Sequence, residues 1–425
     1  MIIARNALFF FIILSFCFLI SSDHFYTRDE LLYFLVAKNI CAFDLTIPND
    51  YKDIDLAIGK DNKLYSPYPF GHSLFAAIFI YPLKNYFDNH IIIVKFFSAI
   101  LTALTISLIF NRYISLTAER KIYFQLFQLF FLFLLFLSTM WCVYTKTFFS
   151  ELSALLIFTI IFFYLTDQPS KKRLFLVGIL FGLLTTIKNI FIIYAFLIPF
   201  FIFDFKFIKK NIITILIFYL LPLLFLFSLN GVFNYLRFAN FFKTGYMSMH
   251  PSGEPHGFTT PLYIGIYGLL FSAGKSVFLY NPVLLLFFFT KKYLAANYKI
   301  FFKFSLAVFI ISILIFAKWV YWFGGANVWG PRFLLPAIAP MLICIYFAFP
   351  YFSKLLKIIF VLLIITGIII NLPALIFDYR NFTNADNWQQ QLQSLFFPQN
   401  SPIIRGFLFL INNFDTRFFD ILLLK

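Results

Sequence analysis

Two acidic segments of the chain could supply a general base. Asp29 and Glu30 are adjacent and open the segment 28–40, in which apolar residues recur with helical spacing. Glu151 stands at the start of the apolar run 150–166. A carboxylate held at a membrane surface can accept a proton from an attacking hydroxyl or amine. Acidic residues in the first turn of a helix are also favoured by the helix dipole and by capping, so chemistry alone leaves both roles open.

Four basic residues stand apart from the basic clusters of the chain, each in a distinctive local sequence: Lys188, Arg237, Lys275 and Arg332. Guanidinium and ammonium groups at an outer membrane interface suit the phosphate of a lipid carrier. Long basic side chains also snorkel to the interface without any ligand, and that explains a single one equally well. Four of them together favour phosphate binding.

A rigid turn is predicted in the segment 60–72. Pro67 and Pro69 are two residues apart, next to tyrosines and followed by Gly71, and this spacing favours an extended turn before the apolar segment 71–83. On structural grounds the turn is a loop clamp, and it can also form one wall of a substrate cavity. Tyr65 and Tyr68 lie in it, and we count them with Glu151 as candidate acceptor-binding residues.

The composition identifies the solvent that these residues face. Hydrophobic residues make up 62% of the 425 residues and charged residues only 12%, and the mean hydropathy is +0.88. A soluble domain carries about 45–50% apolar and about 25% charged residues, so this chain has too little polar surface for a water-soluble globule. Disorder, a disulfide scaffold and a nucleic-acid-binding domain are excluded by the same figures, and membrane lipids are the expected surroundings.

The net charge of +16 reflects topology rather than a polyanionic partner. Sixteen basic residues and three acidic ones fall at Arg5 and in the clusters 112–121, 167–173, 204–210, 291–303 and 354–357. Short basic clusters between apolar runs follow the positive-inside rule and place these segments in the cytoplasm. We therefore expect no nucleic-acid partner. The four cysteines have no spacing typical of a metal site or a disulfide.

Apolar runs predict about eleven spans in a domain over 1–376. They lie at 7–22, 91–110, 122–143, 150–166, 174–203, 211–229, 277–290, 301–320, 332–349 and 357–376. The run 174–203 has basic clusters at both ends and Lys188 in its middle, so we expect a helical hairpin with Lys188 near its outer tip. The first run lacks a cleavage site and is predicted to be a retained span. The N-terminus is then inside and the C-terminus outside.

The segments left outside are expected to carry the chemistry. They are 23–90, 230–276, 318–331 and the short C-terminal tail 377–425. The first of them holds nine of the 18 acidic residues. Within it, 28–40 and 71–83 are too short to span and are predicted to be helices in the interface plane. No internal repeat is visible.

Several motifs resemble those of the polytopic glycosyltransferases of the GT-C fold, in the bacterial branch related to protein O-mannosyltransferases and aminoarabinose transferases. Arg28-Asp29-Glu30-Leu31-Leu32-Tyr33 is similar to the first-loop acidic motif of that family. The turn 63–71 resembles its proline-rich turn, although a double proline before the glycine is more usual there. Phe149-Ser150-Glu151 is similar to its second acidic position, and the segments 271–275 and 329–332 resemble motifs common in this branch. The resemblance covers nearly the whole chain.

This resemblance implies an all-α integral membrane protein with a GT-C-like bundle. It implies transfer of a hexosyl or pentosyl group, with inversion, from a polyprenyl-phosphate-linked sugar to an acceptor outside the cytoplasm. The acceptor would be an envelope glycan such as lipopolysaccharide, a lipid or a protein, and the location a cell inner or plasma membrane. No cofactor or metal would be obligatory. The tail is too short for the large soluble domain of oligosaccharyltransferases, which favours transfer of a single sugar.

The resemblance also implies roles for individual residues. Asp29 would be the catalytic base, with Glu30 and Glu151 orienting the acceptor or the base. Lys188 and Arg332 would hold the donor phosphate, and Lys275 and Arg237 are weaker candidates for that role. Two alternatives remain open, a transporter or flippase of a lipid-linked intermediate and a non-catalytic assembly factor. The charges gathered at one membrane face and the presence of Asp29 weigh against them.

Overall fold

The computed structural model describes residues 2–51, 56–83, 90–117, 121–167, 170–249, 257–295, 298–325, 327–383, 385 and 388–422. Glu119 and Arg120 of the basic cluster 112–121 lie outside these ranges. The described chain is helical apart from turns and one small antiparallel pair, β1 (Ala57–Ile58) with β2 (Leu64–Tyr65), in which Ala57 pairs with Tyr65. The all-α fold class expected from the sequence is confirmed.

The larger helices are α1 (Ile2–Leu19), α4 (His90–Thr117), α5 (Ile122–Leu137), α7 (Glu151–Thr166), α8 (Lys171–Ile187), α9 (Phe191–Ile202), α12 (Leu221–Phe238), α17 (Lys299–Lys318), α18 (Leu335–Ala348), α19 (Lys354–Ile376) and α22 (Pro402–Leu422). The shorter ones are α2 (Arg28–Ile40), η1 (Asn49–Tyr51), α3 (Gly71–Leu83), α6 (Met140–Tyr144), α10 (Phe205–Lys210), α11 (Ile212–Ile215), η2 (Leu216–Leu220), α13 (Gly245–Met249), α14 (Leu262–Phe271), α15 (Val277–Tyr280), η3 (Pro282–Leu286), α16 (Phe287–Tyr293), η5 (Arg332–Leu334), η6 (Phe349–Tyr351), α20 (Arg380–Thr383), α21 (Trp388–Phe396) and η7 (Pro398–Asn400).

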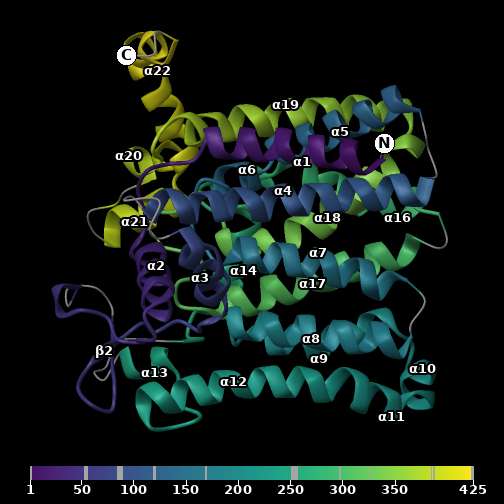
Figure 1. The fold of residues 1–425 in the computed structure, drawn as a ribbon. Coiled ribbons are helices and arrows are strands. Elements are labelled where there is room, and N and C mark those ends of the chain that lie inside the picture. Colours follow the sequence, from purple (N-terminus) through teal and green to yellow (C-terminus); the bar gives the residue numbers. More distant parts are fainter. Residues whose placement is uncertain are drawn as a thin grey trace.

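Most of the long helices lie side by side along one common axis, with their chain directions alternating, and form a bundle (Figure 1). Five helical segments among the described residues are long and apolar enough to cross a membrane: His90–Thr117, Ile212–Phe238, Lys299–Lys318, Arg332–Tyr351 and Lys354–Ile376. The runs 7–22, 122–143 and 150–166 and the second half of 174–203 fall in shorter apolar helices. The run 174–203 is a hairpin of α8 and α9, as predicted, and Lys188 follows the last residue of α8.

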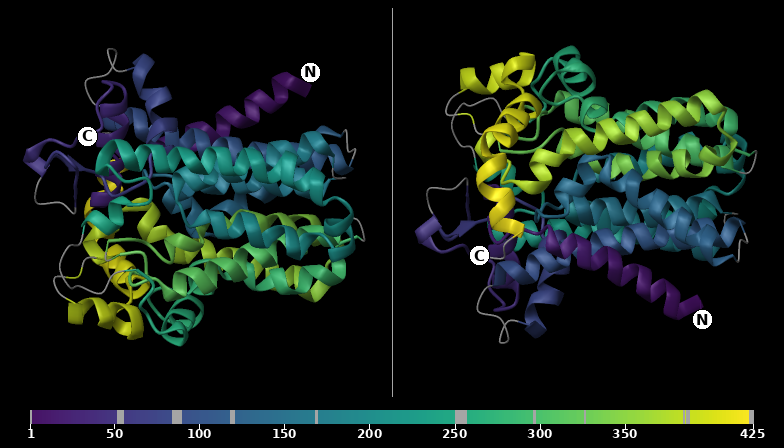
Figure 2. Two further views of the ribbon diagram at one scale, coloured as in Figure 1. Left: turned by 90° about the horizontal axis from the view of Figure 1, so that it is seen from below. Right: turned by 90° about the horizontal axis from the view of Figure 1, so that it is seen from above.

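The two ends of the bundle differ in what they carry. We call them the α2 end and the α10 end. Helices α2 and α3 run across the bundle direction at the α2 end, together with α13 and α20, while α10, α16 and the N-terminus lie at the α10 end (Figure 1). Helix α22 also lies across the α2 end (Figure 2). Predicted interfacial segments 28–40 and 71–83 are therefore helices that lie across the bundle, and two basic clusters share the opposite end.

Two predicted spans are broken rather than continuous. The run 122–143 ends as α5 at Leu137 and resumes as α6, and the run 277–290 divides into α15, η3 and α16 around Asn281-Pro282. Proline lacks the N–H that a continuous helix needs, and freed backbone groups at membrane depth must find partners. The two breaks satisfy each other, because the Met140 N–H donates to Asn281 Oδ1 at 2.8 Å.

A buried asparagine completes this junction. The Asn371 side chain in α19 donates to the Tyr280 carbonyl at 3.1 Å and accepts a hydrogen bond from Trp329 Nε1 at 2.8 Å. Asn371 thereby ties α19 to the end of α15 and to the loop before Arg332. Since Asn371 is 1% exposed, each of these hydrogen bonds replaces one that water cannot make there.

Two glycines allow a close helix contact on one side of the bundle. Gly178 and Gly182 are four residues apart on α8 and face η2 and α12. A Cβ at Gly178 would lie 2.4 Å from the Tyr219 carbonyl oxygen, and one at Gly182 would lie 2.6 Å from Leu226 Cβ. Small residues at this spacing let membrane helices approach closely. Close van der Waals packing then holds the helices together, because lipid is as apolar as the helices and gives no hydrophobic driving force between them.

We therefore expect the substitution Gly182→Leu to destabilise the protein by about 1–3 kcal/mol, because the added side chain must push α8 from α12. Thermal unfolding of the purified protein in detergent measures this effect. Phe175→Leu is the matched control, since Phe175 lies on the same helix and is 44% exposed. Equal melting of Gly182→Leu and Phe175→Leu would contradict the close approach of the two helices.

Candidate functional site

Four charged side chains from four helix ends meet at the α2 end. Asp29 lies in the first turn of α2, Glu151 is the first residue of α7, Lys188 follows α8, and Arg332 begins η5. They come together because α2 lies across the end of the bundle at which α7 begins, α8 ends and η5 begins. The structure thus places side by side four of the residues that the sequence predicts, although up to 303 positions separate them.

The four charges alternate in sign. Arg332 Nη2 lies 2.5 Å from Asp29 Oδ2, and Lys188 Nζ lies 2.6 Å from Glu151 Oε1. Arg332 Nε joins the two pairs, at 3.9 Å from Glu151 Oε1. The Glu151 side chain is 2% exposed and that of Asp29 27% exposed, so the cluster is buried at Glu151 and open at Asp29. Asp29 is therefore the carboxylate that an incoming molecule can reach.

A tyrosine completes the surroundings of Asp29. The Tyr68 hydroxyl donates to Asp29 Oδ1 at 2.6 Å. Burial alone would raise the pKa of Asp29, but the Arg332 guanidinium and the Tyr68 hydrogen bond outweigh it and hold that pKa below the ordinary value of 3.8. Asp29 is therefore ionised. Because each carboxylate oxygen has a second lone pair, Asp29 can still accept a proton.

Aromatic residues support both sides of this cluster. The Tyr33 ring stacks on Tyr68 at a centroid distance of 4.8 Å, and the Tyr33 hydroxyl lies 3.1 Å from Ser150 Oγ. The Arg332 guanidinium lies 4.5 Å from the centroid of the Phe149 ring, and Lys188 Nζ lies 4.7 Å from that of Phe333. These contacts fix the cations by cation–π attraction without using their N–H groups.

One donor of Arg332 is unused. Arg332 as a residue is 9% exposed, and its buried Nε has no hydrogen-bond partner among the described residues. A buried donor without a partner costs free energy, which an anionic ligand would recover. Lys188 is 18% exposed and has two further N–H groups beyond the one that meets Glu151. The residues present can therefore offer donors to a phosphate oxygen.

Glu30 faces away from this cluster. It is fully buried, and its Oε2 accepts from Lys95 Nζ at 3.1 Å and from the Phe148 N–H at 2.7 Å. Oε1 accepts from the Tyr26 N–H at 3.2 Å. Glu30 thus joins the start of α2 to α4 and to the loop before α7. Its contacts orient the helix that carries Asp29, and none of those named here involves Glu151, Lys188 or Arg332.

Two buried lysines near Glu30 were not singled out from the sequence. Lys95 is 1% exposed, and its position inside the apolar run 91–110 was the available signal, since ionisable groups in spans are costly. Lys146 lies in the loop after α6 and donates to the Phe377 carbonyl at 2.8 Å and the Leu375 carbonyl at 3.3 Å. Burial lowers the pKa of Lys146 to about 7.

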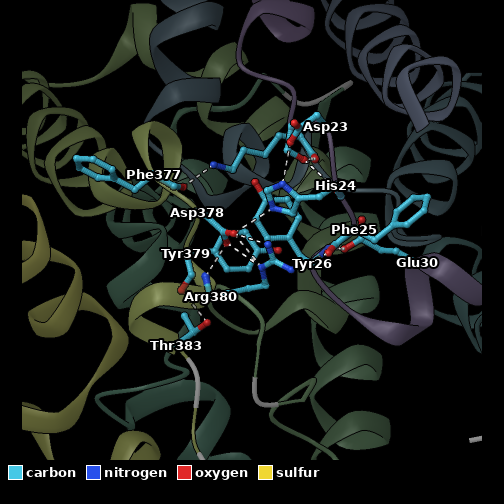
Figure 3. Close-up of polar contacts among 12 residues, drawn as sticks. Asp23, His24, Phe25, Tyr26, Glu30, Phe377, Asp378, Tyr379, Arg380 and Thr383 are labelled. Carbon is cyan, nitrogen blue, oxygen red and sulfur yellow. Dashed lines mark hydrogen bonds and ion pairs between the residues drawn. The ribbon is translucent and has the colours of Figure 1, made fainter. Parts of the chain in front are cut away.

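The C-terminal tail packs against the start of α2 (Figure 3). Tyr26 stacks on Tyr379 at a centroid distance of 4.2 Å. Arg380 lies 2.6 Å from an oxygen of Asp378 and donates to the Phe25 carbonyl at 3.2 Å. His24 Nε2 lies 3.1 Å from Asp378. The segment 377–383 therefore supports the loop that leads into Asp29.

The remaining predicted residues lie outside the cluster. The Tyr65 hydroxyl donates to Asp61 at 3.3 Å, away from Asp29. Arg237 Nη1 donates to the Ser66 carbonyl at 2.5 Å and holds the proline-rich turn. Lys275 Nζ donates to the Val328 carbonyl at 2.8 Å and to the Gly330 carbonyl at 3.2 Å, just before Arg332. Arg237 and Lys275 are used by backbone carbonyls, so no contact here supports their predicted role as phosphate ligands.

Metal ligation has no obvious site. Within the described ranges no three His, Cys, Asp or Glu side chains come close enough together to hold a metal ion. The expectation that no metal is obligatory stays a prediction.

The fold is that of a polytopic membrane protein in which interfacial helices cover one end of the helix bundle. It is similar to that of ArnT from Cupriavidus metallidurans, an aminoarabinose transferase of the GT-C fold. The crystal structure of ArnT bound to undecaprenyl phosphate matches with a TM-score of 0.56 at 12% identity, over 90% of this chain and 66% of that one. The structure of apo ArnT matches with a TM-score of 0.51 at 12% identity, over 84% and 62%.

The likeness confirms the GT-C-like fold expected from the sequence motifs. The chain spans just under two thirds of the length of the two ArnT chains. No family model and no curated protein matches it.

The buried pair of Glu30 and Lys95 yields a stability prediction. Lys95→Met leaves the Glu30 carboxylate buried without its cation, and we expect a loss of about 3–5 kcal/mol. The double variant Glu30→Gln/Lys95→Met removes both charges and should be more stable than Lys95→Met alone. Thermal unfolding of the three purified proteins checks this order. A double variant less stable than Lys95→Met would contradict the pairing.

Proposed function

We propose that the protein is a membrane glycosyltransferase. It transfers one sugar from a polyprenyl-phosphate-linked donor to an acceptor on the extracytoplasmic face, with inversion, and Asp29 is the base. The observation that carries this proposal is the Asp29 carboxylate, kept ionised by Arg332 and Tyr68 and yet 27% exposed. The likeness of the fold to ArnT bound to undecaprenyl phosphate supports a polyprenyl phosphate as the carrier.

The proposed reaction is a single displacement. The acceptor oxygen or nitrogen attacks the anomeric carbon while Asp29 takes its proton. The bond between that carbon and the phosphate oxygen breaks, and its electron pair leaves with the polyprenyl phosphate. The leaving group already carries negative charge, so the site must stabilise an anion and need not protonate it. The Nε of Arg332, which has no hydrogen-bond partner among the described residues, and the remaining N–H groups of Lys188 support that role.

Donor binding would also prepare the base. Arg332 is the cation nearest to Asp29, at 2.5 Å, and a donor phosphate would compete with Asp29 for it. As Arg332 turns to the phosphate, the pKa of Asp29 rises and the carboxylate becomes a better proton acceptor. Lys188 remains in contact with Glu151, whose side chain is 2% exposed. The base is thus strengthened when the donor is present.

The topology supports an extracytoplasmic site. Helices α10 and α16 carry basic clusters and lie at the end opposite to α2 (Figure 1). By the positive-inside rule that end faces the cytoplasm, and Asp29 then faces outward. The proposed location is a cell inner or plasma membrane, and the proposed acceptor is an envelope glycan, a lipid or a protein.

Asp29→Asn tests the role of the base. The amide keeps the shape of the side chain but cannot take a proton, so we expect transfer to slow by about 10²–10⁴-fold. The assay measures the mass and linkage of envelope glycans in cells that hold equal amounts of inserted protein. Asp50→Asn is the matched control, because Asp50 is an exposed aspartate in the same loop. Unchanged glycans in Asp29→Asn cells would overturn the assignment.

Arg332→Gln tests the donor site. Losing the guanidinium should raise the KM for the polyprenyl-phosphate donor more than the KM for the acceptor, because Arg332 is proposed to bind the donor phosphate. Steady-state kinetics with each substrate varied in turn measure the two constants. Lys63→Gln, an exposed cation of the first loop, is the control. A variant with an unchanged donor KM would count against this role for Arg332.

A further inference from the structure

An open cavity lies at the α10 end, away from the Asp29 cluster. Its volume is about 510 Å³, which is within the range of small-ligand sites. It is formed where α16 ends and α17 begins, at the end of the bundle that the positive-inside rule places in the cytoplasm (Figure 1). Its lining consists of three lysines and three aromatic residues: Phe288, Phe289, Lys291, Lys292, Tyr293 and Lys299.

The lining has uncompensated positive charge. No acidic residue lines the cavity, and within the described residues none of its three lysines forms an ion pair. Lys299 is also the first residue of α17, a helix of 20 residues whose N-terminal dipole adds to the positive potential. An anion fits such a cavity better than a neutral or cationic molecule.

The apolar part of the lining indicates what the anion is attached to. Phe288 and Phe289 are 47% and 54% exposed and lie in the first turn of α16, on the membrane side of Lys291 and Lys292. Tyr293 lies beneath Lys292, whose Nζ is 5.6 Å from the ring centroid. A ligand that reaches the lysines with a phosphate can therefore lay an acyl chain against the two phenylalanines.

We infer that this cavity binds the phosphate head group of an anionic glycerophospholipid from the cytoplasmic leaflet. Lysines in a pocket between membrane helices attract such head groups through their charge, and exposed phenylalanines retain the lipid tail. The site is separate from sugar transfer at Asp29, and its occupancy does not depend on the donor or the acceptor.

The test compares two sets of three lysines at the same end of the bundle. Lys291→Gln/Lys292→Gln/Lys299→Gln removes the charge of the cavity. The matched control is Lys206→Gln/Lys209→Gln/Lys210→Gln on α10, where the lysines are also exposed but do not line this cavity. The protein is reconstituted in nanodiscs of phosphatidylcholine with a minor share of phosphatidylglycerol. It is then released from the nanodiscs, and native mass spectrometry counts the lipids that stay bound to it.

We expect the wild type to retain phosphatidylglycerol over phosphatidylcholine, the cavity variant to retain at least fivefold less, and the control to remain within twofold of wild type. Equal losses in the two variants would overturn the inference, because the lysines would then act only as surface charge. Displacement of the lipid by millimolar inorganic phosphate would overturn it too, since the site would then take the free ion.

A second measurement uses the wild-type protein alone, in case the cavity variant does not insert. An amine-reactive acetylating reagent is applied in nanodiscs with and without phosphatidylglycerol, and peptide mass spectrometry reads each lysine. Protection by phosphatidylglycerol of Lys291, Lys292 and Lys299, but not of Lys206, Lys209 and Lys210, supports the site. Equal protection of the two sets contradicts it.

Discussion

The ion pair between Asp29 and Arg332 is the interaction on which the candidate site depends. Burial drives a carboxylate at a membrane face toward its neutral form, and a nearby cation keeps it ionised. Arg332 supplies that cation at 2.5 Å, from a segment 303 positions away in the chain. The bundle must therefore hold the start of α2 next to the start of η5. Much of the surrounding polar structure fixes these two helix starts in place.

Buried polar contacts fix both the start of α2 and the segment that leads into η5. Glu30 and Lys95 fix the start of α2 to α4, and the stack of Tyr26 on Tyr379 supports the preceding loop. On the other side Lys275 holds the carbonyls of Val328 and Gly330 just before Arg332. Burying such groups costs free energy unless each one has its partner. They therefore favour the one helix arrangement in which every partner is present. The aromatic and aliphatic residues, which form the majority of the chain, make the apolar outer surface and pack the interior of the bundle.

The periodicity and charge pattern of the sequence predict the helices well, but they predict poorly which residues contact each buried charge. The apolar runs, the hairpin around Lys188 and the helices 28–40 and 71–83 follow from local sequence, because hydrophobic length and spacing determine them. The sequence predicts Asp29, Glu151 and Arg332 at the starts of apolar segments and Lys188 at the tip of a hairpin. The four side chains meet because these positions share one end of the bundle. The partner of Lys95 and the backbone contacts of Lys275 and Arg237 could not be predicted, since they depend on which helices are neighbours. The role of the segment 377–383 depends on tertiary packing in the same way.

The most direct test of the account is an infrared titration of the Asp29 carboxyl group, identified by the band that Asp29→Asn removes. In the wild type Asp29 should remain mostly ionised as the pH falls to 3.8, because its pKa lies below that value. In Arg332→Gln the protonated band should appear at higher pH, since the compensating guanidinium is gone. An Asp29 band that titrates at the same pH in both proteins would contradict the claim that Arg332 keeps the base ionised.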